Sequence, residues 1–122
     1  MGQVPTGDRR HLIENALRLA GVSPSDANIA AVNTIVQKES SWNPNAVNDW
    51  DSNARKGTPS KGLMQTIGPT FRQYALPGYD KDMTDPTSNL VAGIRYATAR
   101  YGSLQNVPGI RAMARGNAYR GY

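Results

Sequence analysis

Apolar residues recur along much of the chain at intervals of three and four, the spacing of a helix with one buried face. The pattern and its turn residues predict helices over residues 8–20, 24–40, 68–76, 85–101 and 107–116. Ser23 and Pro24 suit the cap and first position of the second helix. Asp85 and Pro86 open the fourth, and Gly102 ends it.

Two polar, turn-rich segments interrupt this pattern, at residues 42–61 and 77–84. No strand pattern exceeds a few residues. A chain of 122 residues fits one domain, and a long loop inside a compact domain is usually functional. We therefore expect an all-α domain over residues 8–122, preceded by a flexible segment at residues 1–7, with long loops beside a functional site.

Glu39 occupies an unexpected position in the second predicted helix. At about 100° per residue it lies about 20° around the helix from Val32, and within about 60° of Ile35 and Val36. A carboxylate therefore interrupts the face that should be buried. Burial disfavours the ionised form and raises the pKa of a carboxyl, which is what a general acid in glycoside cleavage requires. An ion pair with Lys38 or a nearby arginine is the structural alternative.

The residues after Glu39 resemble the soluble lytic transglycosylase (SLT) family of the lysozyme-like superfamily. The resemblance starts at Glu39-Ser40 and Asn43-Pro44-Asn45-Ala46, and continues at Gly62-Leu63-Met64-Gln65. It extends through Asp85-Pro86, Asn89-Leu90 and Ala92-Gly93-Ile94-Arg95-Tyr96, and covers roughly residues 24–102. The long insertion before Gly62 is similar to that of SLT domains in phage tail tape-measure proteins.

The resemblance implies a lysozyme-like (SLT or goose-type) fold with a substrate groove. It also implies cleavage of the β-1,4 bond between N-acetylmuramic acid and N-acetylglucosamine in peptidoglycan. Glu39 would act first as acid and then as base, and the product would carry a 1,6-anhydromuramoyl end. Ser40 would orient the site, while Gln65 and the Leu63-Met64 backbone after Gly62 would line the groove.

The family's Ala-Tyr-Asn-Ala-Gly motif, whose tyrosine contacts the catalytic glutamate, is out of register here. The corresponding region reads Ala114-Arg115-Gly116-Asn117-Ala118-Tyr119-Arg120-Gly121-Tyr122. Tyr119 is the best substitute for that tyrosine, and Tyr122 is the second.

Two other functions remain open. Asp49 or Asp51 could face Glu39 and activate water, which would make the protein a hydrolytic muramidase, although both aspartates could simply stabilise turns. A non-catalytic wall-binding or structural module is the alternative of another class. Trp50, together with Trp42, Tyr74 and Tyr79, could stack on sugar rings or belong to the core.

Composition limits the remaining chemistry. The chain has no cysteine and a single histidine, His11, so we expect no metal and no cofactor. The net charge of +5 and a pI near 9.8 favour an anionic partner, which the resemblance identifies as peptidoglycan rather than nucleic acid or membrane. Without a visible signal peptide, we expect a monomeric domain acting at the bacterial wall, either extracellular or within a larger phage tail protein.

Overall fold

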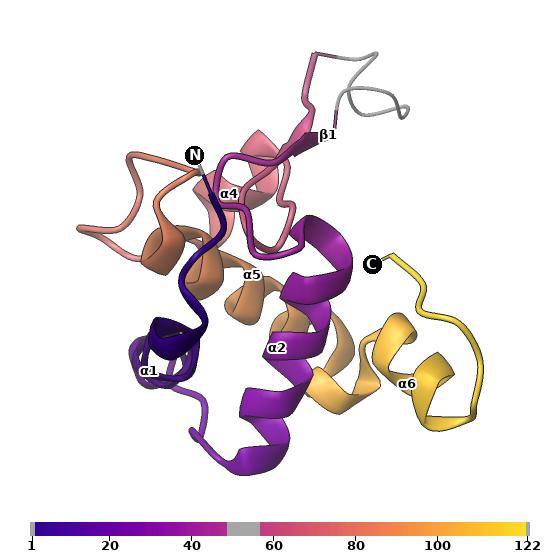
Figure 1. Cartoon of the computed structure of the whole chain (residues 1–122). Helices are drawn as coiled ribbons and strands as arrows, with labels where there is room; N and C mark the ends of the chain where they lie inside the picture. Colours follow the sequence, from indigo (N-terminus) through magenta and orange to yellow (C-terminus); the bar gives the residue numbers. More distant parts are fainter. Residues whose placement is uncertain (1, 49–56, 122) are drawn as a thin grey trace.

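The computed structural model describes residues 2–48 and 57–121, which form a mostly helical domain (Figure 1). Its elements are α1 (Thr6–Leu19), α2 (Asp26–Ser40), β1 (Val47–Asn48), β2 (Ser60–Lys61), α4 (Gly68–Tyr74), α5 (Pro86–Tyr101), the short 3-10 helix η1 (Leu104–Asn106) and α6 (Pro108–Ala114). The prediction of an all-α fold is confirmed, since the described strands have only two residues each.

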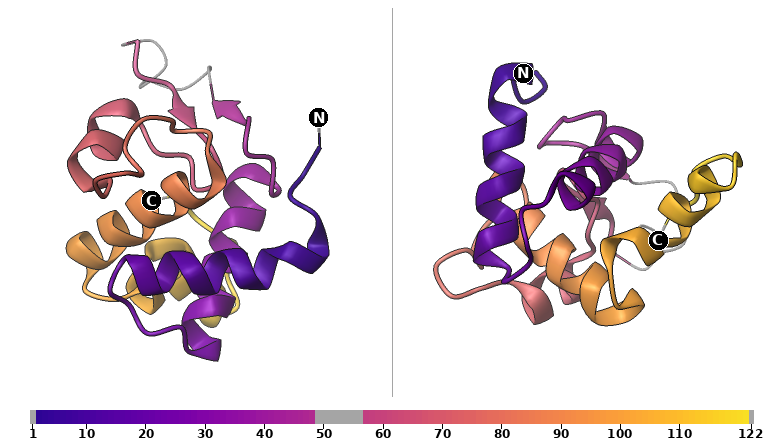
Figure 2. Two further views of the ribbon diagram at one scale, coloured as in Figure 1. Left: turned by 90° about the vertical axis from the view of Figure 1, so that its left-hand side faces the viewer. Right: turned by 90° about the horizontal axis from the view of Figure 1, so that it is seen from below.

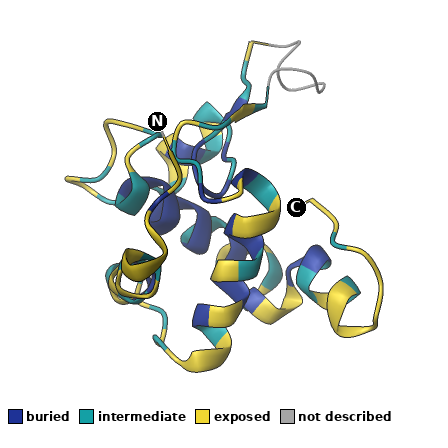
Figure 3. Cartoon of the chain, in the orientation of Figure 1, coloured by how far each residue is buried: buried dark blue, intermediate teal, exposed yellow. Residues whose placement is uncertain are grey.

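Helix α5 lies behind α2, with α1 on one side and α6 on the other (Figures 1 and 2). Seven consecutive residues of α5, from Ser88 to Ile94, are buried, which is about two turns and therefore every side of the helix there. The other helices carry both buried and exposed residues (Figure 3). A helix segment that is buried all round lies at the centre of the packing, and α5 packs against α1, α4 and η1.

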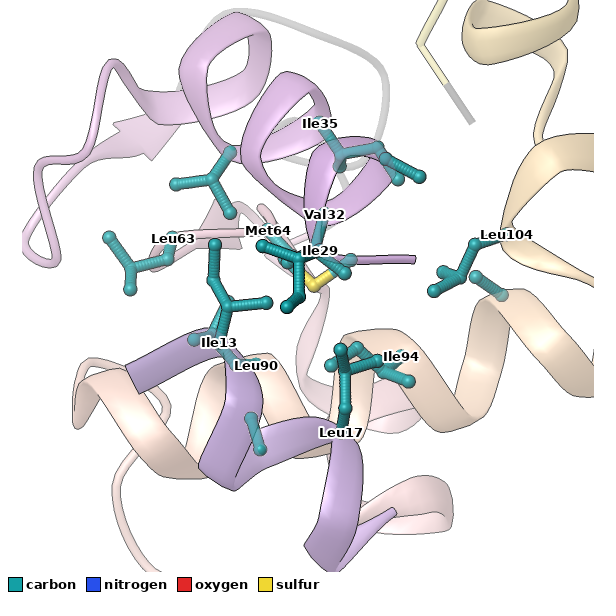
Figure 4. Close-up of a cluster of buried hydrophobic side chains, with 14 of the residues drawn as sticks. Ile13, Leu17, Ile29, Val32, Ile35, Leu63, Met64, Leu90, Ile94 and Leu104 are labelled. Atoms are coloured by element: carbon teal, nitrogen blue, oxygen red, sulfur yellow. The ribbon is translucent and has the colours of Figure 1, made fainter. Parts of the chain in front are cut away.

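The core joins side chains from all parts of the fold (Figure 4). Those with no more than 1% exposure include Ile13 and Leu17 of α1, Val32 and Ile35 of α2, Leu63 and Met64 of the following turn, Leu90 and Ile94 of α5, and Leu104 of η1. The last turn of α2, which carries Glu39, is therefore attached to a rigid core.

Local capping explains where the central helices begin. Asp85 caps α5 by accepting a hydrogen bond from the Ser88 backbone N–H at 3.0 Å, and Gly102 ends the helix with φ of +85°. Both ends agree with the sequence prediction. Helix α2, however, begins two residues later than predicted, because the cap is Ser25 rather than Ser23 and accepts from Asn28 N.

The first residues belong to the body of the domain. Helix α1 begins at Thr6, so the expected boundary at residue 7 falls inside it. Val4 is buried, and its N–H donates to the carbonyl of Trp42 at 2.8 Å. None of the helices described here is long and apolar enough to cross a membrane.

The ends of the first long loop are joined by the two short strands. Val47 pairs with Lys61 and Asn48 with Ser60 in antiparallel register. The chain then enters the turn Gly62–Gln65, which is fixed to α5 by hydrogen bonds of the Asn89 side chain. Asn89 is fully buried; its Oδ1 accepts from Met64 N at 2.8 Å, and its Nδ2 lies 2.8–3.2 Å from Met83 O, Lys61 O and Thr66 Oγ1.

Replacing Asn89 by leucine should destabilise the domain by about 3 kcal/mol or more, because leucine keeps the branched shape of the side chain but leaves buried backbone groups without partners. Urea unfolding followed by circular dichroism measures this loss. Asn28→Ala is the control, since the hydrogen bonds of Asn28 lie at the surface; its cost should stay below about 1 kcal/mol. A loss below about 1 kcal/mol for Asn89→Leu would show that its hydrogen bonds do not hold the turn.

Candidate active site

A groove of about 530 Å³ runs past the end of α2. The C-terminal tail returns to this end of α2 and forms one side of the groove (Figure 1). The lining residues are Lys38, Glu39, Ser40, Ser41, Ala46, Val47, Asn48, Gln65, Tyr119 and Gly121. Glu39 is the only carboxylate among these described residues.

The Glu39 side chain is partly buried in the groove, as its position on the apolar face of α2 predicts. Burial raises the pKa of this carboxyl, and the hydrogen bond from Tyr119 lowers it by a smaller amount. No ion pair involves Glu39 within residues 2–48 and 57–121. Its neighbour Lys38 lines the same groove and forms no such pair. The alternative in which an ion pair neutralises Glu39 is therefore not observed among these residues.

Tyr119 supplies the hydrogen bond to this carboxylate. Its hydroxyl donates to Glu39 Oε2 at 2.7 Å, across eighty residues of sequence. Burial raises the pKa of Tyr119, and the neighbouring carboxylate raises it further. The hydroxyl therefore stays protonated and remains a donor at neutral pH. Tyr119 is the residue that the resemblance placed first for such a contact with Glu39.

Gly109 in the first turn of α6 provides the surface on which the Tyr119 ring rests. A Cβ atom added at Gly109 would lie 2.3 Å from Cε1 and 2.4 Å from Cδ1 of Tyr119, and 2.4 Å from the carbonyl oxygen of Arg120. Only a residue without a side chain permits this approach. The contact fixes the tail against α6 and aims the tyrosine hydroxyl at the groove.

Ser40 attaches the end of α2 to the turn at Leu63. Its buried hydroxyl lies 2.7 Å from Leu63 O and 3.1 Å from Val36 O, so its single proton is directed mainly at the closer carbonyl. Ser40 therefore supports the position of Glu39 from behind.

Gln65 closes the turn on the groove side. Its backbone has φ of +54°, and its Nε2 donates to Gly62 O at 2.8 Å and to Ala46 O at 3.0 Å. Because both amide protons bind backbone carbonyls, the group that Gln65 offers to a substrate is its Oε1 acceptor.

The three residues before Gln65 form the back of the turn. Leu63 and Met64 are fully buried, and the positive φ of Gly62 brings its Cα against Asn89, so a Cβ there would lie 2.2 Å from Asn89 Nδ2. None of the three is among the described residues that line the groove, because the Leu63 and Met64 side chains are buried in the core and Leu63 O and Met64 N bind Ser40 and Asn89.

Of the aromatic residues considered for sugar stacking, the three that the structure describes, Trp42, Tyr74 and Tyr79, do not line the groove. Trp42 is fully buried, donates to Asn33 Oδ1 at 3.1 Å and lies beneath the guanidinium of Arg9. Tyr74 packs edge-on against Tyr96. Four predicted site residues lie outside the described residues: Asp49, Trp50, Asp51 and Tyr122.

Several groove residues were not singled out from the sequence: Lys38, Ser41, Ala46, Val47, Asn48 and Gly121. Ala46, Val47 and Asn48 directly follow the Asn-Pro sequence of the motif, so the motif could have indicated them. Gly109 carries no such signal, because its role depends on contact with a segment ten residues further along the chain.

A mostly helical domain with a partly buried acid in a groove, held by a tyrosine from a distant segment, is the arrangement of a lysozyme-like glycan-cleaving domain. The sequence profile of the transglycosylase SLT domain matches residues 24–121. The chain belongs to this family, whose members are lysozyme-like and act on peptidoglycan.

One curated relative is the uncharacterized protein YqbO of Bacillus subtilis (strain 168), which is 54% identical over 89 residues. The match covers 73% of this chain but 6% of YqbO, so the chain corresponds to a small part of that protein. No solved structure matches the chain significantly.

Replacing Glu39 by glutamine should stabilise the fold at neutral pH. A carboxyl whose pKa is higher in the folded than in the unfolded state contributes its full stabilisation only below the unfolded-state pKa. This stabilisation is lost as the pH rises through the folded-state pKa. The unfolding free energy of Glu39→Gln minus that of the wild type should therefore increase from about pH 4 to about pH 7.5. Urea unfolding of both proteins at the two pH values measures this difference in unfolding free energy.

Glu14→Gln is the matched control for this comparison. The Glu14 carboxylate lies 3.7 Å from Arg10, so its removal loses an attraction and should not stabilise the protein at neutral pH. A difference for Glu39→Gln that stays constant or shrinks with rising pH would contradict a raised pKa.

Replacing Gly109 by alanine should displace the Tyr119 ring and raise the pKa of Glu39 further, because the hydrogen bond that lowers it is weakened. Tyr119→Phe should act in the same direction, and the double variant should add little to either. The pKa of the Glu39 carboxyl, followed by carbon-13 NMR, measures both effects.

Gly7→Ala, also near the start of a helix, is the control because nothing lies within 4 Å of its added Cβ. Alanine favours a helix over glycine by about 1 kcal/mol, so helix propensity alone would make both variants more stable. An unchanged pKa in Gly109→Ala would show that this glycine does not position the tyrosine.

Proposed function

We propose that this domain is a peptidoglycan lytic transglycosylase that cleaves the β-1,4 bond between N-acetylmuramic acid and N-acetylglucosamine, with Glu39 as acid and base. The observation that carries the proposal is the Glu39 carboxyl itself. It lines a groove, its pKa is raised by burial, and it accepts a hydrogen bond from Tyr119. Membership of the SLT family supplies the substrate.

In the first step, the protonated Glu39 donates its proton to the oxygen that links the two sugars. The bond from that oxygen to the muramoyl C1 breaks, and the N-acetylglucosamine leaves with a free hydroxyl. A carboxyl with a raised pKa retains its proton closer to neutral pH, which this step requires. Tyr119 binds Oε2, so the proton is carried by Oε1.

In the second step, the Glu39 carboxylate takes the proton of the muramoyl C6 hydroxyl, and the C6 oxygen bonds to C1. The 1,6-anhydro ring forms, no water is consumed, and Glu39 regains its proton. Because the attacking group belongs to the same sugar, proximity replaces a bound nucleophile. One carboxylate therefore suffices, in accord with the single carboxylate among the described lining residues.

Three of the supporting residues fit this chemistry in different ways. Ser40 holds the end of α2 against the turn, Tyr119 orients the carboxyl, and Gln65 offers an acceptor to sugar hydroxyl or amide groups. The turn that carries Gln65 is shaped by Gly62, Leu63 and Met64, which therefore act indirectly, without contacting the substrate. The reaction requires neither metal nor cofactor.

A hydrolytic muramidase would instead use Asp49 or Asp51 to activate water against C1. Both residues lie outside the described part of the chain, so product chemistry must separate the two reactions. Mass spectrometry of digested glycan strands distinguishes them, since a transglycosylase leaves 1,6-anhydromuramoyl ends and a hydrolase leaves reducing ends. We expect anhydromuramoyl ends; reducing ends alone would contradict the transglycosylase assignment.

We further propose that the domain works as a monomeric module of a larger protein at the bacterial cell wall. The small fraction of YqbO that the match covers supports a modular arrangement. A phage tail protein that opens the wall during infection, carried in the virion, is the setting we favour because of the resemblance to tape-measure domains. Peptidoglycan strands, rather than nucleic acid or membrane, are the proposed partner.

Glu39→Gln should reduce glycan cleavage by about 10²- to 10⁴-fold, since it keeps the shape of the side chain but removes the transferable proton. Release of soluble fragments from purified wall sacculi measures the activity. Glu14→Gln, a carboxyl on α1 away from the groove, should retain it. Undiminished cleavage by Glu39→Gln would remove this residue from the mechanism, and inactive wild-type protein would favour the non-catalytic wall-binding alternative.

A further inference from the structure

A second hollow, of about 400 Å³, lies on the side of α6 and the C-terminal tail away from the described chemistry. Three arginines line it: Arg111 and Arg115, which are one helical turn apart at α6 and its C-cap, and Arg120 in the tail. The other lining residues are Tyr101, Asn106, Pro108, Ala112 and Asn117. Among the described residues, the lining therefore combines three cations with two side-chain amides and contains no carboxylate.

In the part of the chain that the structure describes, no carboxylate forms an ion pair with the arginines of this hollow. The sequence from residue 86 to the end has five arginines and neither aspartate nor glutamate. Within residues 2–48 and 57–121, no ion pair involves Arg111, Arg115 or Arg120, whereas Arg10 on α1 contacts two carboxylates. Like charges four residues apart on a helix repel each other, so an anion in the hollow would relieve an unfavourable arrangement.

The composition of the hollow indicates the chemistry of that anion. All three cations are arginines, whose planar guanidinium groups pair bidentately with phosphate or carboxylate oxygens and are weakly hydrated. Asparagine amides can add hydrogen bonds to the same oxygens. Three cations drawn from two segments suit a ligand with several anionic groups better than a single small anion.

The hollow adjoins the groove but is separated from it by the tail. Tyr119 and Arg120 are consecutive residues, and the first lines the groove with Glu39 while the second lines the hollow. A glycan strand in the groove would therefore place its own substituents on the opposite side of the tail from the arginines. This favours a separate chain lying beside the glycan over a substituent of the reacting sugar.

We propose that the arginine hollow binds phosphodiester groups of an anionic polymer associated with the cell wall. The site would hold the domain on its substrate and press the tail that carries Tyr119 against α6. The wall as the source of the polymer rests on the proposed function, whereas recognition of phosphodiesters rests on the hollow alone.

The test uses the Glu39→Gln variant, so that binding is measured without cleavage. Its affinity is determined for soluble poly(glycerol phosphate), and for wall sacculi before and after hydrofluoric acid removes their phosphodiester polymers. In this background, Arg111, Arg115 and Arg120 are all changed to glutamine. The control triple variant changes Arg18, Arg72 and Lys81 to glutamine, which removes the same charge from exposed positions on α1, α4 and the following loop.

The arginine triple variant should lose at least about tenfold in affinity for poly(glycerol phosphate) and for untreated sacculi. The slope of log affinity against log salt concentration should become shallower by about two. Each phosphate neutralised on a flexible single strand contributes about 0.7 to this slope, and the variant loses three arginines. The control triple variant should keep most of the affinity. Stripped sacculi should bind the parent and the arginine variant equally.

Three results would overturn the proposal. Equal losses in the two triple variants would mean that only net charge matters. Arginine-dependent binding to stripped sacculi would identify carboxylates of the peptide stems as the ligand. Equally tight, arginine-dependent binding to poly(glutamate) of matched charge would show a general polyanion site. Because cleavage is absent from all of these measurements, failure here leaves the test of Glu39 as a catalyst unaffected.

Discussion

The hydrogen bonds of the buried Asn89 side chain connect the centre of the fold to the groove. Asn89 lies on the fully buried part of α5, and it holds the Gly62–Gln65 turn through Met64 N and the Lys61 carbonyl. Leu63 O, which belongs to the same peptide group as Met64 N, accepts a hydrogen bond from the hydroxyl of Ser40. Glu39 directly precedes Ser40, so the position of the acid depends on an amide in the core through only two intervening contacts.

The environment of Glu39 balances two opposing effects. Burial disfavours its ionised form, and the Tyr119 hydroxyl favours it, with burial the larger influence. A more exposed carboxyl would ionise too readily to donate a proton, while one without the tyrosine would hold its proton more tightly, and so be a weaker acid, and would lack a fixed orientation. The same burial weakens the fold when the group is ionised, which is the usual cost of a site shaped for chemistry rather than stability.

Features set by neighbouring residues were predictable from the sequence. The limits of α5 follow from Asp85-Pro86 and Gly102, and the unusual place of Glu39 follows from helical geometry alone. The start of α2 was misjudged, since two serines flank Pro24 and only the folded backbone selects Ser25 as the cap. The functions of Asn89 and Gly109 could not be derived from local pattern, because each depends on a close approach between segments whose distance the sequence does not specify.

The tyrosine contact also bears on how one carboxyl can serve both halves of the proposed reaction. Tyr119 approaches only Oε2, and its hydroxyl can donate to that oxygen whether Oε1 is protonated or not. Because the pKa of Tyr119 is raised, the tyrosine does not compete for the proton that moves between Glu39 and the sugar. The carboxyl can therefore change from acid to base without rotating, provided that the tail stays seated on Gly109. In the proposed reaction the positions of α6 and the tail are thus part of the catalytic geometry, although among their described residues Tyr119 is the one whose side chain donates a hydrogen bond to the acid.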